Sequence, residues 1–162
     1  MGYVYKYVDV EGHGSTSRAY SLIDYGSNIS ILSDELARSA MVQFGQMMPI
    51  RNPRGGISNA WSAVATFCVE YTKQFERIEV AVAPRSLTGE ELLLGSDFVN
   101  VLKTKVDILT ARLRCDYCDQ AITACRCTMK PFARAGPGAP PGPGYPQQGP
   151  PQQQYGQRPP FG

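Results

Sequence analysis

An aspartate, Asp24, lies between an apolar pair and a glycine in the hexapeptide LIDYGS, residues 22–27. An apolar pair belongs in the protein interior, where a lone carboxylate is unfavourable unless it is hydrogen-bonded, paired or partly protonated. Gly26 lets the chain turn tightly and brings its own backbone amide close to the carboxylate. We therefore expect Asp24 to be exposed at the floor of a cleft rather than on a solvated surface.

The composition indicates one soluble globular domain with extensions. The chain has 162 residues, of which 43% are hydrophobic and 19% are charged. Residues 1–102 carry 8 basic and 11 acidic side chains (net −3), whereas residues 103–134 carry 7 basic and 3 acidic ones (net +4). The acidic majority argues against a main domain that binds nucleic acid, and the basic segment leaves weak RNA or protein binding open for the C-terminal region.

The chain is expected to be intracellular and cytoplasmic, without membrane association. It has no apolar run near the roughly 20 residues of a membrane span, and its N-terminal residues lack the core of a signal peptide. In such a compartment, five cysteines are expected to be thiols or metal ligands rather than a disulfide framework.

Residues 1–114 are expected to form an all-β domain with one or two short helices, because short runs of β-branched and aromatic residues alternate with turn residues. The strands are predicted at residues 3–10, 19–24, 63–71, 77–83, 92–95 and 106–113. Ser33 is expected to cap a short helix at 33–38, and a helical turn is expected at 97–102. A hairpin connection is expected at 12–15 and a polar, mobile loop or hairpin tip, which contains Gly55 and Gly56, at 49–58.

This order of elements resembles a retropepsin, the single-lobe aspartic protease of retroviruses and LTR retrotransposons. The family signature is two apolar residues, Asp, Ser or Thr, Gly, and Ala or Ser, and the hexapeptide matches it except at Tyr25. A second hallmark, an apolar run followed by Gly, a polar residue, Asp and an apolar or aromatic residue, matches LLLGSDF at residues 92–98. Residues 28–40 are similar to the segment after the active-site turn in Bel/Pao-type retrotransposon proteases.

The resemblance implies a homodimeric, closed β-barrel that hydrolyses peptide bonds in a peptide or protein substrate. Two Asp24 carboxylates would meet on the two-fold axis and share a proton, so one would activate a water while the other polarises the scissile carbonyl. This chemistry needs no cofactor. The flap that closes over the substrate would contain Gly55 and Gly56. The active-site loop would contain Tyr25, Gly26 and Ser27.

Tyr25 departs from the family pattern. The small hydroxyl residue at that position hydrogen-bonds across the dimer axis, and a phenol is too large to replace it unless the two loops move apart. The chain is therefore either a protease with altered geometry or an inactive retropepsin-like module for dimerisation or peptide binding. A third interpretation is an RNA- or protein-binding adaptor that acts through its C-terminal region.

Several residues have simpler structural interpretations. Asp24 itself could merely cap backbone amides in a turn. Asp97 is expected to be structural, either capping the short helix or pairing with an arginine. His13 is the one histidine and lies in a glycine-flanked turn, which weakens serine- or cysteine-hydrolase interpretations. Cys68 is expected to be an inert core thiol.

Residues 115–130 form a basic segment with four closely spaced cysteines: Cys115, Cys118, Cys125 and Cys127. Four thiolates within 13 residues could surround one tetrahedral zinc ion. Free or redox-active thiols and disulfides are the other interpretations. With zinc bound, a small basic module able to contact RNA would consist of Arg112, Arg114, Arg126 and Lys130.

The last segment, residues 131–162, contains 10 Pro, 7 Gly and 6 Gln among its 32 residues. Such a composition cannot bury a core, so we expect a disordered tail of polyproline character without helix or strand. Its aromatic residues could dock weakly on other proteins, or the tail could be a passive extension.

Overall fold

The computed structural model describes residues 2–70, 72–105 and 112–136. Its helices are α1 (Asp34–Ser39), α2 (Arg85–Thr88) and α3 (Ser96–Lys105). Its strands are β1 (Tyr3–Glu11), β2 (Thr16–Asp24), β3 (Ile31–Ser33), β4 (Phe44–Arg51), β5 (Ile57–Val69), β6 (Phe75–Ala83), β7 (Leu92–Leu94) and β8 (Ala133–Arg134).

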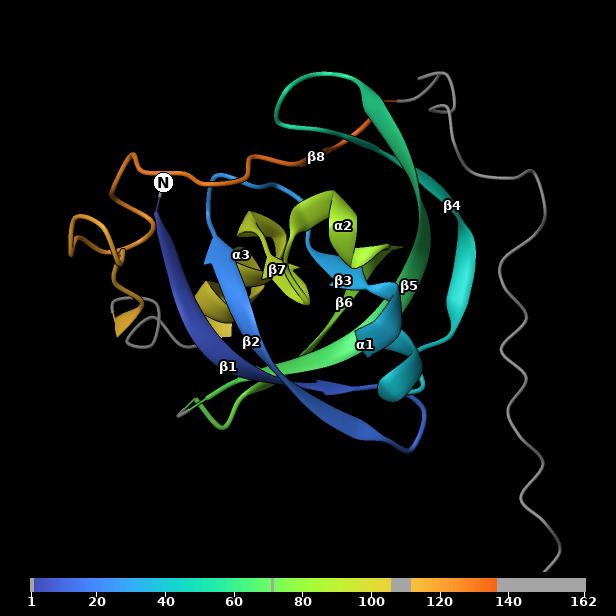
Figure 1. Cartoon of the computed structure of the whole chain (residues 1–162). Helices are drawn as coiled ribbons and strands as arrows, with labels where there is room; N and C mark the ends of the chain where they lie inside the picture. Colours follow the sequence, from blue (N-terminus) through green and yellow to red (C-terminus); the bar gives the residue numbers. More distant parts are fainter. Residues whose placement is uncertain (1, 71, 106–111, 137–162) are drawn as a thin grey trace, which may run out of the picture.

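Six strands close into a barrel in the order β1-β2-β7-β3-β6-β5, because β5 also pairs with β1. Strand β4 pairs with the first half of β5, and β8 pairs with β4. Both strands therefore extend the sheet beyond the closed barrel (Figure 1). The parallel pair β2–β7 aligns Ile23 with Leu94. The prediction of a mostly β fold with a closed barrel is confirmed.

Alternation along the strands produces two hydrophobic clusters, one on each face of the sheet. The main cluster contains Ile23 from β2 and Leu92 and Leu94 from β7. The second cluster contains Leu22 and Leu93 from the opposite faces of the same two strands. This two-sided burial explains why β7 is a continuous apolar run rather than an alternating one.

Most local predictions agree with the structure. Residues 12–15 connect β1 to β2, and Ser33 caps α1 by accepting a hydrogen bond from the Leu36 amide at 3.2 Å. The helical turn at 97–102 is part of the longer α3. Of the loop predicted at 49–58, only residues 52–56 connect the strands; the rest belongs to β4 and β5. The strand predicted at 106–113 falls mostly outside the described residues.

The prediction that no strand follows residue 131 is wrong. Strand β8 pairs antiparallel with β4, aligning Arg134 with Ile50 and Ala133 with Arg51. The composition did not reveal this strand because two residues carry no periodicity and the pairing partner is distant in sequence. Residues 137–162 lie outside the described part of the chain.

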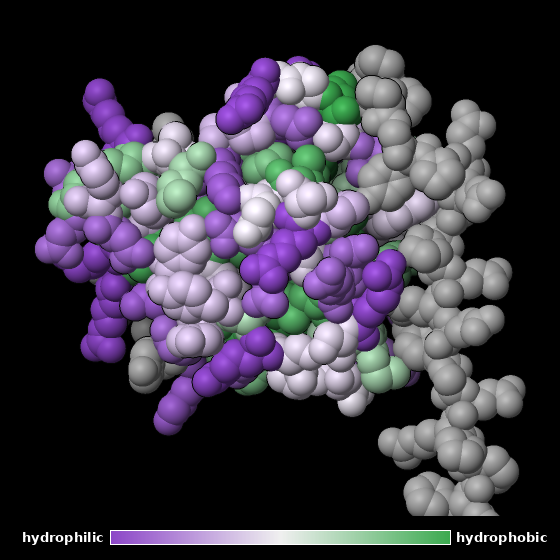
Figure 2. Space-filling view, viewed as in Figure 1, coloured by the Kyte–Doolittle hydropathy of each residue, from purple (hydrophilic) through white to green (hydrophobic). Residues whose placement is uncertain are grey.

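Polar and near-neutral side chains cover most of the face seen in Figure 2, with small hydrophobic areas between them. Among the described residues, no helix is long and apolar enough to cross a membrane.

Candidate functional site

Asp24 is the last residue of β2, and its side chain points into a closed environment. The Gly26 amide donates a hydrogen bond to Asp24 Oδ1 at 2.9 Å, so the turn predicted from the glycine is confirmed. The residue is 0% exposed. The prediction that Asp24 is exposed at the floor of a cleft is therefore wrong for this conformation, because another segment of the chain covers it.

The covering segment is residues 128–135, which we call the C-terminal strap. The Met129 and Lys130 amides donate hydrogen bonds to Asp24 Oδ2 at 2.8 and 2.7 Å. Thr128 Oγ1 donates to Asp24 Oδ1 at 3.1 Å. With the Gly26 amide, the buried carboxylate has four donors, which offset the cost of removing it from water.

Beyond Asp24, the strap continues in contact with the loop that follows β2. The Phe132 carbonyl accepts hydrogen bonds from the Asn28 amide and from Ser27 Oγ, both at 3.0 Å. The Phe132 side chain is 3% exposed and completes the second hydrophobic cluster. The Ala135 amide then donates to the Pro49 carbonyl of β4 at 3.1 Å. The strap thus links Asp24 to β4, across one end of the barrel (orange in Figure 1).

Gly26 also permits the close approach of the strap. A Cβ at this position would lie 2.2 Å from Thr128 Oγ1, well inside van der Waals contact. Thr128 and Met129 are nevertheless exposed on their outer side. The cover over Asp24 is therefore a single layer of polypeptide, and its removal would open Asp24 to solvent.

Tyr25 is half-buried and packs against the main hydrophobic cluster of its own chain. Its hydroxyl donates a hydrogen bond to Asn100 Oδ1 in α3 at 2.9 Å, and its amide donates to the Gly2 carbonyl at 2.8 Å. Its neighbour Ser27 is 0% exposed, and the Ser27 carbonyl accepts from the Ser96 amide at 2.6 Å. The loop is thus anchored to α3 by contacts on both sides of Gly26.

The predicted flap residues lie at the tip of the β4–β5 hairpin. Gly55 and Gly56 have φ angles of 83° and 81°, which a glycine adopts without strain. Apart from the adjacent residues, no atom of the described part of the chain would lie within 4 Å of a Cβ on either glycine, so the tip is open. An open cleft of about 460 Å³ separates this tip from the strap and α2, lined among others by Arg54, Leu87 and Met129.

Asp97 has the structural role predicted for it. Its carboxylate accepts hydrogen bonds from Ser30 Oγ at 2.7 Å, from the Ser30 amide at 3.0 Å and from the Phe98 amide at 2.8 Å. It therefore caps α3, as one of the two predicted alternatives stated. Burial raises the pKa of Asp97, although these three hydrogen bonds favour its ionised form.

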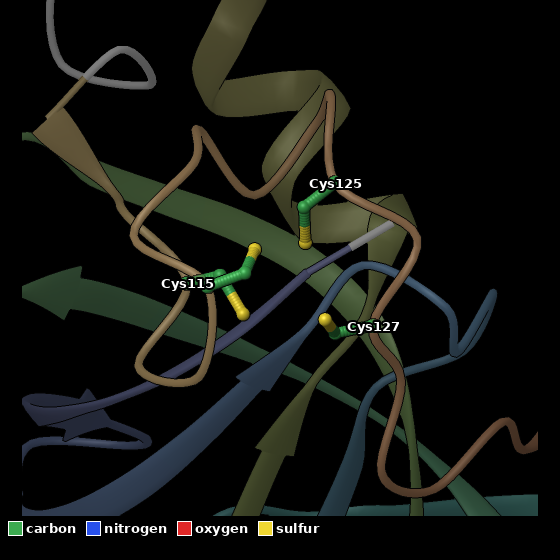
Figure 3. A group of neighbouring side chains, drawn as sticks. Cys115, Cys125 and Cys127 are labelled. Atoms are coloured by element: carbon green, nitrogen blue, oxygen red, sulfur yellow. The ribbon is translucent and has the colours of Figure 1, made fainter.

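The four cysteines of residues 115–130 converge on one point. Their Sγ atoms all lie within 4.8 Å of one another, and Figure 3 shows the sulfurs of Cys115, Cys125 and Cys127 pointing together. Sulfurs around a tetrahedral zinc ion are roughly 3.8 Å apart, given a Zn–S bond of about 2.3 Å. A small contraction would suffice, so this cluster could hold a metal ion. All five cysteines of the chain are free thiols, so the disulfide interpretation is not supported.

The pKa values of the cysteine thiols in the cluster are shifted in opposite directions. Burial raises the pKa of Cys115, but hydrogen bonds from backbone amides and from the Cys125 thiol outweigh it and lower the pKa to about 6. Burial and hydrogen bonds with Cys118 and Cys115 raise the pKa of Cys127 to about 12. Loss of a proton from the cluster is therefore easiest at Cys115. A cation bound among the four sulfurs would stabilise the thiolate forms of the other cysteines as well.

The cysteine cluster is continuous with the barrel. The Asp116 amide donates to the Tyr3 carbonyl of β1 at 2.9 Å, and Ile122 is buried in the main hydrophobic cluster. A Cβ on Gly2 would lie 2.5 Å from Cys125 Sγ, so the N-terminal residue of the described chain packs directly against the cluster.

The remaining candidate residues have structural or solvent-facing positions. Cys68 is buried in β5, as predicted, and His13 is exposed in its turn. Two members of the predicted basic module are paired: Lys130 with Glu90 at 3.1 Å and Arg114 with Asp119 at 3.0 Å.

The residues that sequence reasoning missed are the strap residues at Asp24, which lie 104 to 106 positions further along the chain. The only sequence signal was Phe132, an aromatic residue near the start of the Pro-rich segment. Comparison with protein-family models and with curated protein sequences finds no match for this chain.

Proposed function

We propose that this chain is a retropepsin-like aspartic endopeptidase whose substrate groove runs between Asp24 and β4. One observation carries the proposal: a polypeptide segment already crosses this groove. The strap donates hydrogen bonds to the Asp24 carboxylate at one end and pairs with the hairpin strand β4 at the other. A peptide substrate in the same groove would use the same backbone partners.

Catalysis in this proposal requires two copies of the chain. Each barrel contributes one Asp24, and two adjacent carboxylates share a proton because both cannot ionise at close range. The Gly26 amide, 2.9 Å from Oδ1, would orient each carboxylate. Because the strap amides saturate Oδ2 in the described conformation, the strap must leave before a water can bind there.

The test is proteolysis of a peptide library at acid pH by the full chain. A Phe132→Ala variant, in which the strap loses its buried anchor, is expected to cleave faster than the wild type. Adding Asp24→Asn to that variant is expected to abolish cleavage, with His13→Asn as a surface control. Cleavage that survives Asp24→Asn would exclude Asp24 as the catalytic residue. Sedimentation of the Phe132→Ala variant should show a dimer.

A non-catalytic peptide-binding or dimerisation module is the second candidate, and two observations favour it. Tyr25 is hydrogen-bonded to Asn100 rather than free to bridge a dimer, and Asp24 accepts hydrogen bonds from four protein donors. A Tyr25→Ser change in the Phe132→Ala background separates the two candidates. Cleavage that appears only with this change would assign the natural chain to the non-catalytic class.

We further propose that the cysteine cluster binds zinc, since four thiolates are a common structural zinc set. Reduced thiols of this kind suit an intracellular, cytoplasmic location. Zinc content of the purified chain should be one ion per chain, and Cys115→Ser should reduce it. An RNA-binding adaptor is less well supported, because Lys130 and Arg114 are engaged with acidic side chains. The full chain is expected to bind RNA no more tightly than an Arg126→Gln variant.

A further inference from the structure

The strap contacts the groove with side chains as well as backbone. Lys130 Nζ donates hydrogen bonds to the Thr88 carbonyl and to Glu90 Oε1, the latter at 3.1 Å. Two positions later, the Phe132 ring is buried among the aliphatic residues of the second cluster. The groove therefore has an acidic position and an apolar position, spaced for a basic residue two positions before an aromatic one.

Both positions are offered by residues of the barrel and α2 rather than by the strap. Glu90 follows α2 and also accepts a hydrogen bond from the Tyr5 hydroxyl at 2.8 Å, so its carboxylate is held in place from β1. The apolar position belongs to the second hydrophobic cluster, whose buried members outside the strap include Leu22, Ile29, Ile31, Ile50, Ala83 and Leu93. These are features of a site that would remain after the strap departs.

The cysteine cluster lies directly before the first residue of the strap. Cys127 directly precedes Thr128, and Cys125 lies two residues earlier. With a metal bound to both thiolates, Thr128 could shift little relative to Asp24. At its other end the strap is held by hydrogen bonds: β8 pairs with β4, the Ala135 amide donates to the Pro49 carbonyl, and the Arg134 amide donates to Asn28 Oδ1. A metal on the two thiolates would therefore tie down the end of the strap next to the cysteines through coordinate bonds rather than hydrogen bonds.

We propose that residues 128–135 are a resident peptide ligand of the Asp24 groove, held there by a metal at the cysteine cluster, and that loss of the metal admits other extended peptides with the pattern basic-x-aromatic. This inference rests on the proposed peptide groove and specifies its ligand and its regulation. A tethered ligand acts at an effective concentration in the millimolar range, so a free peptide cannot compete with it. Metal loss frees Cys127, lowers that effective concentration and opens the groove to competitors.

Binding of a fluorescent heptapeptide, TMKPFAR, to the full chain tests the proposal. Anisotropy should show at least tenfold tighter binding after a chelator removes zinc under reducing conditions than with zinc present. The matched peptide TMEPAAR, which lacks the basic and aromatic residues, should bind at least tenfold more weakly to the same chelated protein. Equal binding of TMKPFAR with and without zinc would overturn the proposal that the metal holds the strap in the groove. Equal binding of the two peptides would overturn the basic-x-aromatic recognition pattern.

A variant separates release of the strap from unfolding of the domain. Phe132→Ala loosens the strap without touching a cysteine, so the zinc-loaded variant should bind TMKPFAR without chelator, whereas the Phe75→Ala control, altered at an exposed phenylalanine of β6, should not. If chelation unfolds the wild-type barrel, as judged by circular dichroism, the comparison of Phe132→Ala with its control variant tests the proposal without chelator. No binding by zinc-loaded Phe132→Ala would overturn the proposal.

Hydrogen exchange gives an independent measurement. The Met129 and Lys130 amides, which donate to Asp24, should exchange at least tenfold faster after zinc removal, while barrel amides of β5 and β6 remain protected. Unchanged exchange at these two amides would overturn the link between metal and strap. Peptide binding without cleavage would reject the endopeptidase alone, and cleavage without selective binding would reject this inference alone.

Discussion

Asp24 is the last residue of β2, and Asp97 lies just after the neighbouring parallel strand β7, yet their carboxylates are satisfied in different ways. Asp97 receives all its described hydrogen bonds from Ser30 and from the Phe98 amide at the start of its own helix. Asp24 receives one from Gly26 and three from residues 128–130 of the strap. One carboxylate is thus locked by the barrel, and the other by a segment laid across the end of the barrel.

This difference indicates which carboxylate can change its environment without unfolding of the domain. Ser30 is itself fully buried and donates to Asp97 while accepting from the Gly95 amide at 3.0 Å. Displacing Asp97 would therefore disrupt the junction of β3, β7 and α3. Displacing the strap would break its bonds to Asp24 but leave the six barrel strands paired. We infer that Asp24 is the aspartate available for chemistry or ligand binding.

The largest loss of folding stability is expected from Asp97→Ala. It leaves the Ser30 hydroxyl and the Ser30 and Phe98 amides without their acceptor, at about 1–3 kcal/mol for each group left unsatisfied. We expect the free energy of unfolding to fall by about 3 kcal/mol or more, measured by urea denaturation of the full chain. A smaller loss than that of Asp24→Asn would break the comparison between the two carboxylates.

A smaller and more local effect is expected from Asp24→Asn. The amide group of asparagine cannot accept all four hydrogen bonds, so the strap should detach at a cost of about 1–2 kcal/mol. Urea denaturation measures the cost, and limited proteolysis should show faster cutting near residues 128–135 with the barrel intact. Thr16→Ala, at an exposed side chain, serves as a control. Cutting throughout the barrel would contradict a local role for Asp24.

The smallest effect is expected at Glu90, which links the strap to β1. Burial and the hydrogen bond to Glu90 raise the pKa of Tyr5 from 10.0 to about 12. A raised pKa in the folded state stabilises the protein fully below pH 10, and this contribution is lost as the pH rises towards 12. Glu90→Gln should remove the charge and lower the Tyr5 pKa. It should also weaken the Lys130 contact by up to about 1 kcal/mol.

Tyrosinate absorbance during an alkaline titration measures the Tyr5 prediction, with Tyr5→Phe as the reference that identifies its contribution. A Tyr5 midpoint that is the same in the wild type and in the Glu90→Gln variant would show that burial alone sets it. In that case the Tyr5–Glu90 contact would not contribute to holding the strap.

The amino-acid sequence by itself determined the local elements of this protein. The alternation in β1, β2 and β5, the continuous leucine run of β7, the Ser33 cap and the Gly26 turn all depend on residues adjacent in the chain or a few positions apart. Backbone conformation and side-chain periodicity act over this range, so these features could be predicted. The convergence of four cysteines within 13 residues could be anticipated for the same reason.

Only the tertiary structure decided the environment of Asp24. Its cover comes from residues more than 100 positions away, at the end of the cysteine-rich segment, and its hydrogen bonds are donated mainly by backbone amides, which every non-proline residue has. The direction of Tyr25 towards Asn100 likewise depends on where α3 packs. A turn motif fixes the position of an aspartate on its own strand, but long-range packing determines whether that aspartate meets water, a substrate or its own chain.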